Sequence, residues 1–206
     1  MNKKLLLTGV FAGLVIISIY TFQGTSQITD GYVEGIESQR QEKNDEFKNS
    51  EDTPLTKEQK GLFTSLIYFP IAEKYKVRAE FHKNPREQKV KIAITDGSQR
   101  EYFVFGNAHI HLEGKELNLT VYKSIKTDAD YLFIPFYDET SADLTYGGGR
   151  YVEPEIIDGG TIEIDFNTAY NPYCAYNHTY RCPIPPQENN LNVSILAGEK
   201  IPDFAN

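Results

Sequence analysis

Acidic, basic and phenolic side chains gather in the second half of the sequence, and these are the groups that proton-transfer chemistry uses. Asp138 and Glu139 follow an apolar run, Arg150 follows a Gly-rich turn, and Tyr170 lies further along the chain. If these four side chains converge, they form a set that a hydrolase-like enzyme could use. Adjacent acidic residues after a strand also form solvated turns, and the acidic pair could make a structural salt bridge with Arg150. The sequence leaves the catalytic and the structural interpretation open.

A second group of side chains is typical of a surface that contacts a small polar molecule. Its members are Tyr146, Arg150, Asp165, Asn167, Tyr170, Asn171 and Tyr173. Asn amides, carboxylates and Tyr rings can together bind a sugar or a similar ligand. The same residue types also satisfy the backbone of irregular loops, so a structural role competes. The Gly-rich segment 146–150 could hold an anion, but Pro154 excludes the following helix that a nucleotide phosphate loop needs.

Cys174 and Cys182 are the only cysteines, and seven residues separate them. Outside the cytoplasm we expect such a pair to form a disulfide, and closing so short a loop stabilises by roughly 2–3 kcal/mol. Free structural thiols, a metal site that includes His178, and a nucleophilic cysteine are the alternatives. Metal ligands usually come in tight pairs, and His109 and His111 are typical of the exposed face of a strand. We therefore expect neither a metal nor a cofactor.

Charge and missing motifs exclude several common functions. The 206 residues carry 21 basic and 29 acidic side chains, a formal net charge of −8. Such a body would repel a phosphate backbone, so nucleic acid is not an expected partner. The sequence contains no Gly-x-Ser-x-Gly elbow, no His-Glu-x-x-His motif, no Walker loop and no EF-hand loop. The hydrolases and ion-binding proteins that depend on those motifs are disfavoured.

The N-terminus has the pattern of a membrane-targeting segment. From Leu5 to Phe22 there are 18 residues without a charge, preceded by Lys3 and Lys4. A helix of that length spans about 27 Å, close to the thickness of the hydrocarbon core of a bilayer. Basic residues before the span and acidic residues after it predict that the C-terminal domain lies outside the membrane. A single retained span, and a cleaved signal that releases a secreted or periplasmic protein, both stay open because no Ala-x-Ala site follows.

The remaining sequence predicts one β-rich domain. We expect a signal-anchor or signal peptide over residues 1–24, a polar stalk with a solvated helix over 25–53, and a single domain over 54–206. Thr56 and Gln59 fit a capping box that begins a short helix. Period-two alternation predicts strands near residues 77–81, 90–94, 102–105, 109–112, 117–121, 131–136, 162–164 and 191–195. About seven to eight short strands with tight Gly turns favour an antiparallel barrel, roll or sandwich.

Five motifs in the C-terminal part carry a family resemblance. They read YLFIPFYDETS (131–141), TYGGGRY (145–151), DFNTAYNPYCAY (165–176), CPIPPQEN (182–189) and AGEK (197–200). In this order they resemble the bacterial domain of unknown function DUF1684, and the resemblance extends back through Pro70, Phe63 and Leu55, so that it covers about two thirds of the chain. It implies a bacterial source and a shared β-rich domain, and it implies no activity. We therefore expect a cell-envelope domain that binds a small polar ligand or a partner protein, with an uncatalogued hydrolase-like enzyme as the alternative.

Overall fold

The computed structural model describes residues 31–125 and 131–203. The chain divides into two compact units, Met1–Gln41 and Glu42–Asn206, and each is considered by itself. A helix covers residues 31–49 and therefore begins in the first unit and ends in the second. The second unit contains the whole sheet and all of the candidate site residues.

The expected N-terminal hydrophobic helix cannot be compared with the structure. The segment from Leu5 to Phe22 lies outside the described residues. In the part of the chain that is described, no helix is both long and apolar enough to cross a membrane.

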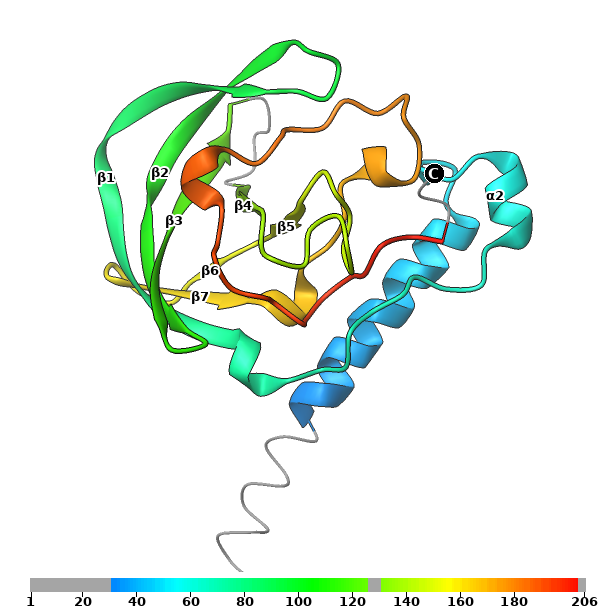
Figure 1. The fold of residues 1–206 in the computed structure, drawn as a ribbon, viewed down its shortest axis with the longest axis horizontal. Coiled ribbons are helices and arrows are strands. Elements are labelled where there is room, and N and C mark those ends of the chain that lie inside the picture. Colours follow the sequence, from blue (N-terminus) through cyan, green and yellow to red (C-terminus); the bar gives the residue numbers. More distant parts are fainter. Residues whose placement is uncertain (1–30, 126–130, 204–206) are drawn as a thin grey trace, which may run out of the picture. The chain divides into compact units, whose positions relative to one another are not determined.

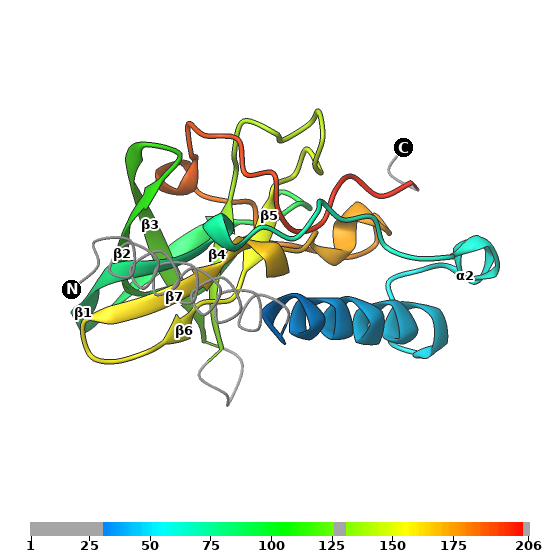
Figure 2. The ribbon, with the colours of Figure 1, turned by 90° about the horizontal axis from the view of Figure 1, so that it is seen from below.

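The second unit is built on one seven-stranded antiparallel sheet that curls into a half-barrel (Figure 1). Its strands are β1 (Lys76–Ala93), β2 (Gln99–Leu112), β3 (Lys115–Ser124), β4 (Leu132–Phe136), β5 (Arg150–Val152), β6 (Glu155–Ile156) and β7 (Thr161–Asp165). They lie in the order β5-β4-β3-β2-β1-β7-β6. Figure 2 shows β6 and β7 side by side at one edge of this sheet. The prediction of a mainly β, antiparallel fold is confirmed.

Two register shifts, one in β1 and one between Val104 and Gly106 of β2, explain why these strands are longer than the sequence pattern predicts. The first two predicted strands form the single strand β1, whose register against β2 shifts between Lys83 and Gln88. The turn between β1 and β2 contains Gly97, whose positive φ of 83° is readily adopted by glycine. Residues 84–87 interrupt the period-two pattern, which divides one strand into two in the sequence.

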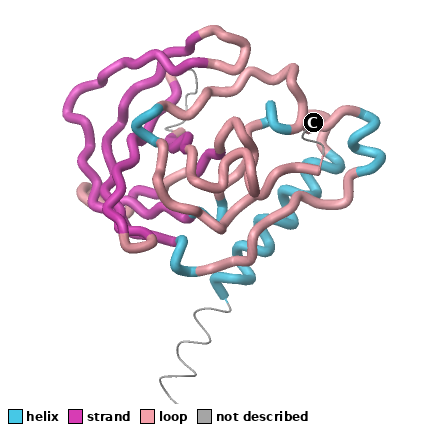
Figure 3. The backbone as a smooth tube through the Cα atoms, in the orientation of Figure 1, coloured by secondary structure: helices cyan, strands magenta, loops and turns pink. Residues whose placement is uncertain are grey.

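The predicted strand near residues 191–195 is wrong. This segment makes only scattered backbone hydrogen bonds, among them Leu191 N–H to Tyr137 O and Glu139 N–H to Val193 O. It crosses the concave side of the sheet without joining a ladder, as the tube in Figure 3 shows. Its alternation is real, since Leu191, Val193 and Ile195 are all buried. The apolar pattern therefore reports packing onto the sheet here and not strand pairing.

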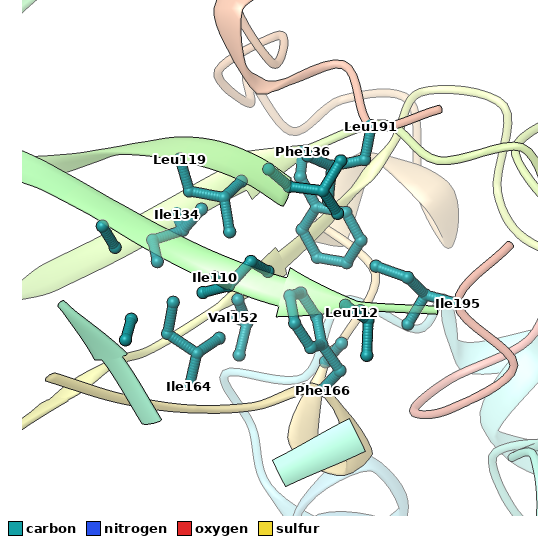
Figure 4. Close-up of a cluster of buried hydrophobic side chains, with 14 of the residues drawn as sticks. Ile110, Leu112, Leu119, Ile134, Phe136, Val152, Ile164, Phe166, Leu191 and Ile195 are labelled. Atoms are coloured by element: carbon teal, nitrogen blue, oxygen red, sulfur yellow. The ribbon is translucent and has the colours of Figure 1, made fainter. Parts of the chain in front are cut away.

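The main core lies between the concave face of the sheet and this C-terminal segment (Figure 4). Ile110, Leu119, Ile134 and Val152 come from β2 to β5, and none is more than 1% exposed. A smaller aromatic cluster covers the opposite face near β4 and includes Tyr122. Both faces of β4 are therefore buried, which accounts for the nearly continuous apolar run that forms this strand.

Apart from the helix over residues 31–49, the helices in the described residues are short. They are α2 (Lys57–Leu62) and the 3-10 turns η1 (Glu73–Tyr75), η2 (Phe166–Thr168), η3 (Tyr173–Ala175) and η4 (Gln187–Asn189). The capping box of Thr56 and Gln59 forms as predicted. The burial of Phe47 differs from the prediction of a solvated stalk helix with little apolar face to bury. Phe47 is 1% exposed, and its ring lies 5.0 Å from that of Tyr176.

Candidate functional site

Two of the predicted catalytic residues meet inside the core. Arg150 begins β5 and Asp138 follows β4, and the two strands are neighbours in the sheet. Arg150 Nη2 donates to Asp138 Oδ1 at 3.3 Å, and both side chains are 1% exposed. Burial lowers the pKa of Arg150, and the nearby charge of Asp138 opposes that shift. An arginine stays protonated in proteins, so this is a buried ion pair.

The C-terminal segment wraps around that ion pair. Arg150 donates to the carbonyl oxygens of Ile195, Ala197 and Glu199. Asp138 Oδ2 accepts from the N–H of Ile195 at 2.7 Å. A loop without a ladder partner needs side chains to satisfy its backbone, and the ion pair does this for residues 195–199. The geometry gives Asp138 and Arg150 a structural role.

Glu199 forms a second buried polar centre. Its Oε2 accepts from the N–H of Asn171 at 2.8 Å and from the hydroxyl of Tyr176 at 2.7 Å. Its Oε1 lies 2.6 Å from Lys43 Nζ, and the Glu199 side chain is 1% exposed. Burial and the charge of Glu199 raise the pKa of Tyr176 well above its ordinary value, so the phenol remains a donor. Every oxygen of this carboxylate is thus occupied by a donor from the domain itself.

The other two catalytic candidates lie in different surroundings. Glu139 is exposed, and its Oε2 accepts from Ser194 Oγ at 3.2 Å. The Tyr170 hydroxyl is 2.7 Å from that of Tyr131 and 3.0 Å from Glu153 Oε1. Burial raises the pKa of Tyr170 well above the ordinary value of a tyrosine. The hydrogen bonds join only Asp138 and Arg150 out of the four catalytic candidates.

The predicted ligand-binding amides bond mainly to the main chain. Asn167 pairs with both the N–H and the carbonyl of Ala72, at 2.9 Å each. Asp165 Oδ1 accepts from the N–H of Asn167 and so caps η2. Asn171 Nδ2 donates to Lys200 O at 2.8 Å. These contacts match the structural interpretation that the sequence left open.

Two predicted ligand-binding aromatic residues, Tyr146 and Tyr173, make packing contacts inside the domain. The Tyr173 ring lies 6.1 Å from Phe47 and 5.3 Å from Tyr180. The carbonyl oxygen of Tyr146 accepts a hydrogen bond from the N–H of Gly149, which closes a turn. The Tyr146 hydroxyl lies 3.9 Å from Cys174 Sγ. The Gly-rich segment is therefore a tight turn that leads into Arg150.

The two cysteines come together beside this turn. The N–H of Cys174 donates to Cys182 Sγ at 3.3 Å, and both side chains are buried. The pairing predicted from the sequence is compatible with this contact, and the disulfide stays a prediction. Within the described residues, no cluster of three His, Cys, Asp or Glu side chains suits a metal ion.

A shallow pocket lies where the chain enters the domain. It is lined by Leu62, Phe63, Thr64, Ser65, Leu66, Ile67, Tyr176, Lys200, Pro202 and Asp203. Leu62 is 76% exposed and Ile67 is 36% exposed, so large apolar side chains stand at its rim beside the charged Lys200 and Asp203. Ile201 and Leu144 extend this rim, because the N–H of Ile201 donates to Leu144 O and the N–H of Lys200 donates to Ile67 O. We refer to this pocket and its apolar margin as the entry groove.

Sequence reasoning missed both the entry groove and two of the buried anchors. One wall of the groove consists of the end of α2 and the segment 63–67 that follows it. This segment mixes polar and apolar residues and contains no recognisable motif. Asn189 pairs with the N–H and carbonyl of Thr120 as a strand residue would. Lys43 lies far from Glu199 in the sequence. A cluster of Asn and Asp near coil segments was the one available signal, and it indicated backbone support correctly.

Comparison with known proteins identifies the family but no activity. The model of the family described as "Protein of unknown function (DUF1684)" matches residues 61–200. A solution NMR structure of an uncharacterised protein from gene locus rrnAC0354 of Haloarcula marismortui is similar. The two chains are 30% identical with a TM-score of 0.67, and the match covers 84% of this chain and 96% of the other. No curated protein matches the sequence. The chain therefore belongs to the DUF1684 family.

Proposed function

We propose that this chain is a non-catalytic domain of the cell envelope that binds an extended peptide segment of a partner protein in the entry groove. The observation that carries this proposal is the contrast between charged side chains bound inside the core and a groove with exposed apolar side chains at its rim, although Arg150 Nε has no partner among the described residues. Asp138, Arg150 and Glu199 are each held by donors and acceptors of the core. A catalytic acid or base must instead reach a substrate.

The groove offers what an added peptide strand uses. One of its walls is segment 63–67, which belongs to no helix or strand and in which Phe63 and Leu66 are buried while Thr64 and Ser65 face solvent. Among the described residues, the main-chain N–H groups of Thr64 and Ser65 have no hydrogen-bond partner. Peptides that add to such an edge gain main-chain hydrogen bonds and place alternate side chains in apolar pockets.

An apolar rim favours a peptide over a small polar ligand. Leu62, Ile67 and Ile201 are among the few large apolar side chains that are exposed in the described structure. The polar side chains that seemed suited to a sugar, such as Asn167 and Asn171, already bond to the main chain. Of the two ligand classes expected from the sequence, the partner protein is therefore the better supported.

Binding can be tested with a fluorescein-labelled hexapeptide of alternating valine and threonine and the full-length protein, followed by fluorescence anisotropy. We expect saturable binding that weakens at least about tenfold in Leu62→Asp and Ile67→Asp, because each loses an apolar contact of about 1.5 kcal/mol or more. Ile156→Asp is the matched control, since Ile156 is 46% exposed on β6. Equal affinity in all three variants, or tight binding of a peptide whose threonines are replaced by proline, would contradict the proposal.

Location in the envelope is the second part of the proposal, and the uncharged segment from Leu5 to Phe22 supports it. Alkaline phosphatase folds to an active enzyme only outside the cytoplasm, so a fusion after Asn206 reports the side of the membrane. We expect activity from the full-length fusion and its loss when residues 5–22 are deleted. A green fluorescent protein fusion at the same position should give the opposite result. Active phosphatase in the deleted form would argue against this role of the segment.

A further inference from the structure

The cysteine pair has chemistry that partner binding does not use. Cys174 belongs to η3, and Cys182 begins the segment that lies beside the end of β1. The N–H of Thr95 donates to Cys182 O at 3.0 Å, and the N–H of Cys182 donates to Thr95 Oγ1 at 3.1 Å. These two hydrogen bonds hold the main chain of Cys182, and the N–H of Cys174 donates to Cys182 Sγ at 3.3 Å.

The surroundings make the two sulfur atoms unequal. Cys182 Sγ accepts the Cys174 N–H, and the thiol of Cys174 also donates to it. These donors, together with the charge of Arg100, lower the pKa of Cys182. The pKa of Cys174 is raised, first because its thiol proton bonds to Cys182 and then because the side chain is buried. A thiolate stabilised by donors beside a protonated thiol is the arrangement of an attacking and a resolving cysteine.

The two sulfur atoms also differ in what covers them. Cys182 is 8% exposed and follows Arg181, whose side chain is 71% exposed. Cys174 is 4% exposed and lies under the hydroxyl of Tyr146. The residues just before Cys182, His178 and Thr179 among them, face solvent. Both side chains are buried, but that of Cys182 adjoins an exposed segment, whereas that of Cys174 lies beneath Tyr146.

We propose that Cys174 and Cys182 form a thiol–disulfide exchange site, in which Cys182 reacts with an external disulfide and Cys174 completes the bond inside the protein. The Cys182 thiolate attacks one sulfur of the external disulfide, whose S–S bond breaks and releases one thiolate. Cys174 then loses its proton and attacks the Cys182 sulfur, which expels the second thiolate. Both released thiolates take up protons, so one external disulfide becomes two thiols and the cysteine pair becomes oxidised.

The site can be tested with oxidised glutathione and the reduced full-length protein, analysed by intact mass. In the wild type we expect an intramolecular disulfide without a lasting adduct, and reopening in excess reduced glutathione. Cys174→Ser should trap one glutathione on Cys182, since serine keeps a donor beside that sulfur. Cys182→Ser should react at Cys174 at least about tenfold more slowly. Equal rates in the two variants, a stable adduct on the wild type, or a disulfide that reduced glutathione does not open would overturn the proposal.

The pH dependence of alkylation tests the same site without a substitution. The rate of iodoacetamide reaction at Cys182, mapped by peptide mass, should rise with pH and level off at a midpoint below the ordinary cysteine value of about 8.5. The sign follows from the lowered pKa, because the reactive thiolate forms at lower pH. Alkylation of Cys174 at the same rate, or a midpoint at the ordinary value, would contradict the assignment. Neither experiment depends on peptide binding, so the two proposals can fail separately.

Discussion

Replacement of Arg150 by methionine is expected to lower the free energy of unfolding by about 3–5 kcal/mol, because it leaves the buried Asp138 carboxylate without its partner. It also removes the donors to three carbonyl oxygens of the C-terminal segment. Domains of this kind are commonly stable by about 5–15 kcal/mol, so the variant would be close to unfolding. Urea denaturation followed by circular dichroism measures the difference.

Arg181→Met is the matched control for this prediction. Arg181 also makes an ion pair, to Asp96 at 3.2 Å, but its side chain is 71% exposed. Exposed pairs contribute little, so we expect a loss of less than about 1 kcal/mol. Arg150→Lys should fall between the two, since it keeps the charge but cannot reproduce the planar guanidinium contacts. If Arg150→Met were as stable as Arg181→Met, the structural role of the buried pair would be wrong.

Gly198→Ala is the second substitution with a large expected effect. Gly198 has a positive φ of 74°, and an added Cβ would lie 2.5 Å from Ala169 O and 2.8 Å from Phe166 O. The conformation alone costs about 1–2 kcal/mol for alanine. Because the crowding atoms are two backbone oxygens and the Cβ of Ala169, none of which can rotate away, relief requires moving the C-terminal segment away from η2. We expect a total loss of about 3 kcal/mol or more, measured by the same urea titration.

Gly97→Ala separates the two contributions. Gly97 has a φ of 83°, but nothing lies within 4 Å of the position that a Cβ would occupy. Only the conformational cost of about 1–2 kcal/mol should appear. A loss at Gly198 no larger than the loss at Gly97 would show that the C-terminal segment is not tightly seated against η2.

The parts of the fold that the sequence predicted are those governed by local rules. Alternation at Val77, Ala79 and Phe81 marks β1, and Gly97 and Gly114 mark the turns at either end of β2 because both take a positive φ. The capping box at Thr56 likewise depends only on residues within one helical turn. Each of these signals is complete within a few positions, so no knowledge of the tertiary structure was needed.

The parts that could not be predicted depend on partners far apart in the chain. The alternation of Leu191, Val193 and Ile195 is the same for a strand as for an irregular segment seated on a core. Nothing in the sequence pairs Lys43 with Glu199. A charged residue in a Gly-rich turn is usually solvated, and Arg150 is buried only because Asp138 and several carbonyl oxygens converge on it.

For the candidate site, the sequence indicated which residues lie close together better than it indicated what those residues do. Asp138 and Arg150 were selected as a candidate pair, and the structure does bring them into contact. The suggestion that Asn and Asp support irregular backbone also describes Asn167 and Asn171 well. The entry groove was missed because Leu62 and Ile67 are exposed but belong to residue types that usually lie in the core, and the sequence does not distinguish the two cases.

The seating of residues 191–199 against the concave face of the sheet has a consequence for biosynthesis. A ribosome completes every strand before it makes the segment that covers them, so the nascent sheet has an open apolar side until that segment emerges. The ion pair between Lys43 and Glu199 likewise joins a residue that is synthesised early with one that is synthesised near the end of translation. Contacts so distant in sequence form slowly. Late completion of the core is compatible with the export proposed above, because a secretion channel requires an unfolded polypeptide.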